Sequence, residues 1–125
     1  MMRPHHIAIL SSDKEASLAF YRTLGFSLTE TVNRPACGDE ICFLSGNGMT
    51  LELFIAAGRP PHVSDPEAYG VRHLAFACTD LDALRASLLV AGYLPEPLRR
   101  DSRTGERMFF VKDPDGLPME LREQI

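Results

Sequence analysis

The pattern of hydrophobic and polar positions predicts eight short strands, because strand side chains alternate between two faces and short apolar runs end at polar or turn-forming residues. In the first half of the chain the strands are expected at 5–10, 27–33, 40–45 and 49–55. In the second half they are expected at 72–78, 94–98, 107–112 and 118–123. The chain is therefore rich in strands, and each half carries four of them.

A helix is expected after the first strand of each half, because apolar residues recur there at helical spacing. The apolar stripe consists of Ala16, Phe20 and Leu24 in the first half, and of Leu81, Leu84 and Leu88 in the second. Asp13 and Asp80 precede these stripes and are suited to accept backbone N–H bonds as N-caps. Gly25 and Gly92 follow the stripes and are suited to end the helices.

The two halves repeat each other in sequence. His6 and His73 lie 67 positions apart, and the same offset pairs Ala8 with Ala75 and Asp13 with Asp80. Near the end of each half the offset becomes 68, which one inserted residue explains, and Glu52 then pairs with Glu120. Such an ordered series of identities indicates an internal duplication.

The fold class that follows is α+β, with two tandem βαβββ modules in a single domain over residues 1–125. The modules are expected at about 1–56 and 71–125, and the Gly- and Pro-rich segment at about 57–70 is expected to link them. Each helix covers one face of a mixed sheet. The other faces are expected to curve around a central concave site for a metal and a substrate.

Strand alternation places four chemically active side chains on that concave side: His6, Glu52, His73 and Glu120. A carboxylate is costly to bury unless a cation compensates its charge. Nitrogen and oxygen donors without thiolate suit one divalent ion of Zn, Ni, Co, Fe or Mn. The alternative is that the histidines are satisfied core residues and the glutamates are exposed, but equivalent positions in both repeats favour a metal site.

Composition narrows the range of partners. The net charge of −4 argues against a nucleic-acid partner, and no apolar run reaches the length of a membrane span. The N-terminal residues lack the apolar stretch of a signal peptide, so a cytoplasmic location is expected. Three cysteines without Cys-x-x-Cys spacing predict neither a disulfide framework nor a thiolate zinc site.

Two stretches carry a resemblance to a known family. The first is His6-Ile-Ala-Ile followed by residues 17–26, and the second is residues 110–121, which include an Asp-Pro-Asp-Gly turn. Together they resemble the vicinal oxygen chelate superfamily, also called the glyoxalase/bleomycin resistance/dioxygenase superfamily, over essentially the whole chain. The similarity is greatest to the glyoxalase I (lactoylglutathione lyase) branch. Ser11 departs from the pattern, which has Val or Ile there.

The resemblance implies a metal site of His6, Glu52, His73 and Glu120, and a lyase/isomerase reaction on a hemithioacetal or α-hydroxycarbonyl compound. A divalent metal holding both vicinal oxygens would stabilise an enediolate, and a carboxylate would move the proton. Glu120 and Glu52 are the candidate catalytic residues, with Glu120 preferred. Ring-cleaving dioxygenases and thiol transferases of the family generally lack a counterpart of Glu52, and metal-free drug-binding members lose the ligands.

The substrate is expected to be a small molecule, and the resemblance allows a thiol adduct. Cationic side chains that could bind its acidic groups are Arg34, Arg103, Arg107 and Lys112. The resemblance also implies a homodimer, with the metal site either within one chain or shared between two. Two alternatives remain open: another reaction of the family, by thiol transfer or Fe-dependent oxygenation, and a non-catalytic module that binds a drug or metabolite.

Overall fold

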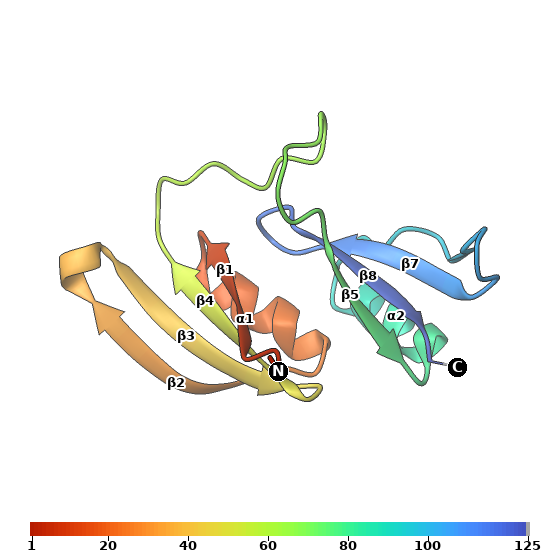
Figure 1. Cartoon of the computed structure of the whole chain (residues 1–125), viewed down its shortest axis with the longest axis horizontal. Helices are drawn as coiled ribbons and strands as arrows, with labels where there is room; N and C mark the ends of the chain where they lie inside the picture. Colours follow the sequence, from red (N-terminus) through yellow and green to blue (C-terminus); the bar gives the residue numbers. More distant parts are fainter. Residues whose placement is uncertain (125) are drawn as a thin grey trace. The chain divides into compact units, whose positions relative to one another are not determined.

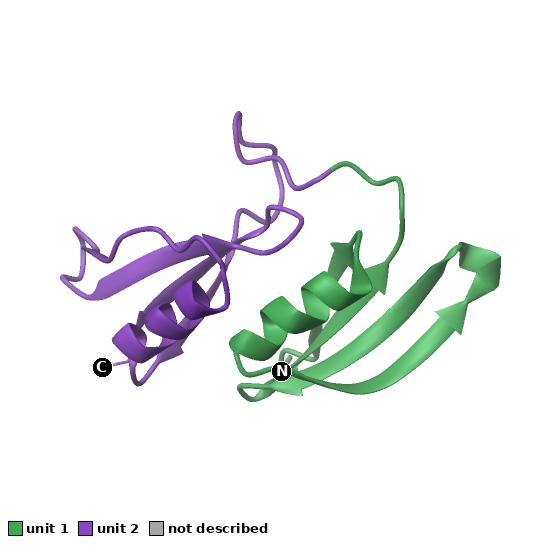
Figure 2. Ribbon diagram, turned by 180° about the vertical axis from the view of Figure 1, so that it is seen from behind, with its two compact units in different colours: residues 1–60 green, residues 61–125 purple. Residues whose placement is uncertain are grey.

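The computed structural model of the chain describes residues 1–124, which form two compact units. Unit 1 comprises Met1–Pro60 and unit 2 comprises Pro61–Ile125 (Figure 2). The division falls inside the segment that the sequence marks as a linker.

Unit 1 is a four-stranded mixed sheet with one helix (Figure 1). Its elements are β1 (His6–Ser11), α1 (Lys14–Thr23), β2 (Ser27–Arg34), a 3-10 turn (Pro35–Cys37), β3 (Asp39–Gly46) and β4 (Met49–Ile55). The strand order is β1-β4-β3-β2, with β1 parallel to β4 and the other neighbours antiparallel.

Unit 2 has the same topology. Its elements are β5 (Leu74–Cys78), α2 (Leu81–Val90), β6 (Arg99–Arg100), β7 (Arg107–Lys112) and β8 (Pro118–Glu123). The order β5-β8-β7-β6 matches that of unit 1 strand for strand, again with the first pair parallel. The predicted α+β fold with two tandem βαβββ modules is therefore confirmed.

The prediction of a strand at 94–98 is wrong. The chain pairs with β7 over only two residues, Arg99 and Arg100. Pro95 and Pro97 fall in the expected segment, and proline has no N–H to donate to a strand ladder. Between them Glu96 donates a single backbone bond to the carbonyl of Phe110 at 2.8 Å, so the segment runs along the sheet without joining it.

Both helices begin and end as the sequence predicts. The carboxylates of Asp13 and Asp80 accept bonds from the backbone N–H groups three residues later, at 3.0 and 2.9 Å. Gly25 and Gly92 follow the helices with φ of +92° and +91°, a conformation that glycine adopts without a Cβ penalty. In each case the next residue's N–H bonds back into the last helical turn, which is the Schellman arrangement.

Each sheet has one covered and one uncovered face (Figures 1 and 2). The covered face packs on the unit's helix, and its central strands supply buried leucines and methionine: Leu51, Leu53, Met119 and Leu121. Burying such a side chain contributes about 1.5–3 kcal/mol. On the opposite face, called the helix-free face below, Ala8 and Ala75 are exposed. The alternation of apolar and polar positions along the strands therefore corresponds to the helix-covered and helix-free faces of the sheets.

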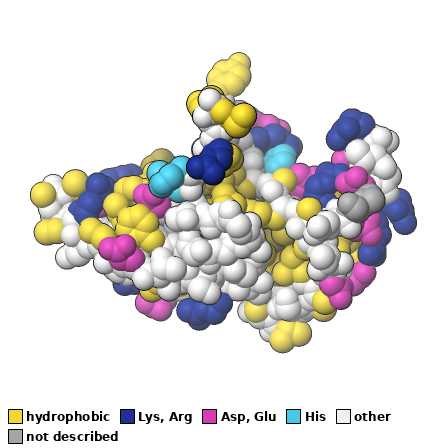
Figure 3. Space-filling model, turned by 60° about the horizontal axis from the view of Figure 1, so that its bottom comes forward, with side chains coloured by type: hydrophobic (Ala, Val, Ile, Leu, Met, Phe, Trp, Pro, Cys, Tyr) yellow, Lys and Arg dark blue, Asp and Glu magenta, His cyan; other side chains and the backbone are white. Residues whose placement is uncertain are grey.

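Among residues 1–124, no helix is long and apolar enough to cross a membrane. Each α-helix has 10 residues, about half of what a span needs. Acidic and basic side chains are interspersed on the face drawn in Figure 3.

Candidate functional site

In unit 1 the neighbouring strands β1 and β4 bring His6 and Glu52 together. Glu52 stands beside Ala8 in the parallel register, and the small alanine leaves space for the imidazole two residues earlier. Nδ1 of His6 lies 3.1 Å from Oε2 of Glu52. The same Nδ1 also lies 2.8 Å from Nδ1 of His5, so the adjacent histidine contacts the pair at its exposed edge.

Unit 2 contains the equivalent pair. Glu120 stands beside Ala75 in the parallel register of β8 and β5, and Nε2 of His73 lies 3.2 Å from Oε2 of Glu120. The edge of the Phe110 ring packs against the His73 ring, with centroids 5.2 Å apart. Glu120 is 8 % exposed, which makes it a nearly buried carboxylate.

The four predicted ligands thus form two pairs, one in each unit. Among the described residues, no group of three or more His, Cys, Asp or Glu side chains lies close enough together to hold a metal ion. Each pair combines an imidazole nitrogen with a carboxylate oxygen, which is a donor set that suits divalent transition metals. The single four-ligand site therefore stays a prediction.

Charge at the unit 2 pair favours a cation. Glu120, Asp101 and Glu106 surround one guanidinium, that of Arg122, and the arginine that contacts His73, Arg72, is itself paired with Glu67. A surplus of carboxylate in a partly buried place is stabilised by a cation. The donors and the local charge therefore fit a divalent metal.

The present contacts also show which bond a metal at Nε2 of His73 would replace. The Arg72 guanidinium lies 3.1 Å from Nδ1 of His73, and arginine can only donate, so we assign Nδ1 as acceptor and Nε2–H as donor to Glu120. Coordination at Nε2 would require that proton to move to Nδ1, which could then no longer accept a bond from Arg72. Arg72 is 63 % exposed, so it can turn away at little cost.

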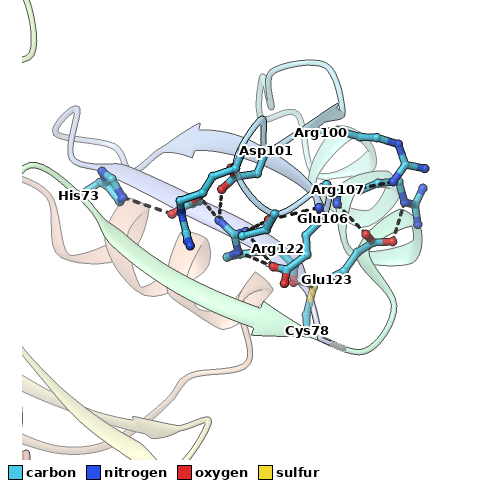
Figure 4. Close-up of polar contacts among 12 residues, drawn as sticks. His73, Cys78, Arg100, Asp101, Glu106, Arg107, Arg122 and Glu123 are labelled. Atoms are coloured by element: carbon cyan, nitrogen blue, oxygen red, sulfur yellow. Dashed lines mark hydrogen bonds and ion pairs between the residues drawn. The ribbon is translucent and has the colours of Figure 1, made fainter.

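Arg122 is the residue that the sequence reasoning missed (Figure 4). It lies two positions after Glu120 on β8, hence on the same helix-free face, and its Nη1 donates to Oε1 of Glu120 at 2.9 Å. Its remaining bonds go to the loop between β6 and β7, at Asp101, Thr104 and Glu106. The i, i+2 spacing of Glu120 and Arg122 was the available signal, whereas the loop partners had none.

The carboxylates around Arg122 raise the pKa of its guanidinium, with the bond to Glu106 as the largest cause. The pKa of Asp101 is lowered, first by the backbone N–H of Arg103 and also by Arg122. Both shifts favour the charged forms of Arg122 and Asp101, as expected for an ion pair between them.

The four cations expected to bind substrate are placed differently from one another. Arg34 makes a bidentate ion pair with Asp39 and lies over the Phe54 ring, 5.2 Å from its centroid. Arg103 and Lys112 are exposed. Arg107 points to the helix side of its sheet, where it binds Asp82 and Glu123.

The chain is similar to known proteins in sequence and in structure. The model of the Glyoxalase/Bleomycin resistance protein/Dioxygenase superfamily matches residues 3–121. The chain belongs to this superfamily. The uncharacterized protein YwkD of Bacillus subtilis (strain 168) is 45 % identical over 122 residues, which cover 96 % of this chain and 95 % of YwkD.

Two solved structures of the superfamily are also similar. The glyoxalase family protein from Enterococcus faecalis has a TM-score of 0.90 at 42 % identity, covering 97 % of each chain. The trypanothione-dependent glyoxalase I of Leishmania major has a TM-score of 0.75 at 26 % identity, covering 98 % of this chain and 87 % of that one. The superfamily predicted from the two sequence stretches is confirmed.

Proposed function

We propose that this superfamily member is a divalent-metal-dependent lyase/isomerase of the glyoxalase I type. The observation that carries the proposal is the His–Glu pair in each unit, at equivalent register positions and on the helix-free face in both. Four neutral or acidic donors without a thiolate suit Zn, Ni, Co, Fe or Mn. His6, Glu52, His73 and Glu120 are the proposed ligands.

When bound, the metal would act as a Lewis acid that stabilises negative charge developing on two neighbouring substrate oxygens. The chain's own part is to hold the substrate and move a proton. One of the two glutamates takes the proton from the hydroxyl-bearing carbon beside a carbonyl and returns it to the carbonyl carbon, while the hydroxyl proton passes to the neighbouring oxygen. Because the same proton is returned, the reaction needs no oxidant or second substrate.

The proposed substrate class is a hemithioacetal or an α-hydroxycarbonyl compound. The similarity to a trypanothione-dependent glyoxalase I supports a thiol adduct. Arg103 and Lys112 are the better placed of the proposed substrate-binding cations, because both are exposed, whereas Arg34 and Arg107 are engaged in ion pairs. We further propose a cytoplasmic homodimer, with the four ligands drawn from one chain or from two.

The experiment measures metal content and turnover together. The protein and its Glu52→Ala variant are loaded with Ni²⁺, Co²⁺ or Zn²⁺, freed of excess metal, and assayed with methylglyoxal and a thiol. About one ion per site, weakened by the substitution, together with isomerase turnover, is the expected result. Metal content that is the same in the wild type and in Glu52→Ala would instead favour thiol transfer or oxygenation. No bound metal would overturn the proposal in favour of a binding module.

A further inference from the structure

The two glutamates are equivalent in the sequence repeat but not in the structure. The offset of 68 that pairs Glu52 with Glu120 also pairs Phe54 with Arg122. The position two residues after the glutamate therefore carries a cation in unit 2 and an aromatic ring in unit 1. The sequence repeat alone does not show which of the two carboxylates moves the proton. This difference between the units distinguishes them.

Arg122 holds Glu120 in one orientation. A guanidinium has five N–H groups, and each of those of Arg122 has an acceptor: Nε and Nη2 bind Glu106, Nη2 also binds Thr104, and Nη1 binds Asp101 and Glu120. A planar fork bound at every position cannot turn without breaking several bonds. Its bond occupies Oε1 of Glu120 and leaves Oε2 directed at His73.

Glu52 has no such restraint. Among residues 1–124 its one polar side-chain partner is His6, and that imidazole is itself more than one third exposed. Phe54, at the position of Arg122, cannot donate a hydrogen bond and instead lies under Arg34. The Glu52 carboxylate is therefore free to change its orientation at the cost of a single contact.

We infer that Arg122 is a positioning residue that would hold Glu120 as a lasting ligand of the proposed metal and would leave Glu52 as the carboxylate that exchanges during turnover. The inference rests on the proposed function and deepens it. It also revises the preference for Glu120 as the proton-moving residue, because a carboxylate fixed by an arginine and a metal is not free to reach a substrate carbon. Ligand-orienting partners of this kind typically change metal affinity by about 10–100-fold when removed.

The chain offers a matched control for a test of Arg122. Arg107 lies in the same sheet, on the opposite face, and bonds two carboxylates, Asp82 and Glu123, where Arg122 bonds three. Arg122→Met and Arg107→Met remove a comparable set of ion pairs, and neither removes a proposed ligand. Of these two arginines, Arg122 touches a proposed ligand and Arg107 does not, so a general loss of stability would affect both variants and a loss of positioning would affect one.

The experiment measures Co²⁺ affinity by chelator competition and records the Co²⁺ absorption spectrum for the wild type, Arg122→Met, Arg122→Lys and Arg107→Met. We expect affinity to fall about 10–100-fold in Arg122→Met with a changed spectrum, to recover in part in Arg122→Lys, and to stay near wild type in Arg107→Met. Equal affinities and spectra in Arg122→Met and Arg107→Met would overturn the inference and leave the proposed function standing. A wild type that binds no Co²⁺ would overturn both.

The same measurements on two further variants test the division of roles between the glutamates. Gln keeps an oxygen donor that Ala lacks. Glu52→Gln is therefore expected to hold more metal than Glu52→Ala and to lose turnover, and Glu120→Gln is expected to lose more metal than Glu52→Gln. The reverse pattern would contradict the assignment of Glu52 as the exchanging carboxylate.

Discussion

Gly46 is the last residue of β3, and it lies directly against the end of α1. A Cβ built on it would come within 2.2 Å of the carbonyl oxygen of Gly25 and 3.0 Å of the Phe26 Cα. Ordinary contacts of a Cβ are 3.4–4 Å, so the strand end or the helix end would have to move by more than 1 Å. Both obstructing atoms are backbone, and neither can avoid the methyl group by changing a rotamer. Gly46→Ala is therefore expected to be strongly destabilising.

The magnitude follows from two contributions. Overpacking costs about 1–3 kcal/mol, and the required shift would also disturb the 2.8 Å bond from Asn47 Nδ2 to the Leu24 carbonyl, worth about 1 kcal/mol. Reduced flexibility of the unfolded chain offsets about 0.4–1 kcal/mol. The net loss is then about 1–3.5 kcal/mol, or a fall of roughly 5–15 °C in Tm for a chain of this length.

Gly48→Ala is the matched control, because its cause of strain is different. Gly48 has φ of +73° and no atom within 4 Å of an added Cβ, so its substitution costs only the left-handed conformation, about 1–2 kcal/mol. Urea unfolding followed by circular dichroism would compare the two variants. If Gly46→Ala proves no less stable than Gly48→Ala, the close packing of β3 on the helix end is refuted.

Three further measurements test other parts of the structure. Asp80→Ala should destabilise by about 1 kcal/mol in urea unfolding through loss of the N-cap of α2, whereas Asp80→Asn should cost much less, and equal losses would contradict the capping role. The pKa of Asp82 is lowered by its bond to Arg107, so this stabilisation is present above the ordinary aspartate pKa of about 3.9 and is lost as pH falls through the lower pKa of the fold. Stability measured from pH 6 to 2 should therefore fall less steeply in Arg107→Met, and parallel curves would count against the pair. Cys37 is exposed and Cys42 is buried with a raised pKa, so mass spectrometry should find alkylation of Cys37 in the native protein and of Cys42 only on unfolding.

Much of the fold was determined by local sequence. The helix limits follow from side chains within a few residues, since Asp13 and Asp80 cap the N-termini and Gly25 and Gly92 provide the left-handed C-terminal residues. Strand alternation sets each of these side chains opposite the buried apolar residues of its own strand, and the parallel pairing of the two strands then brings the histidine and the glutamate together. The internal repeat then carries the arrangement of one unit over to the other.

Tertiary structure decided which cations lie near the proposed ligands. Arg107 and Arg122 look alike in the sequence, but β7 and β8 turn them to opposite faces, one toward α2 and one toward Glu120. The partners of Arg122 come from a loop more than ten residues away, and no periodicity encodes such a contact. Sequence alone therefore determined the fold and the four proposed ligands, whereas the difference between Glu52 and Glu120 depends on packing across the sheet, because hydrogen-bond partners distant in sequence meet only in the folded chain.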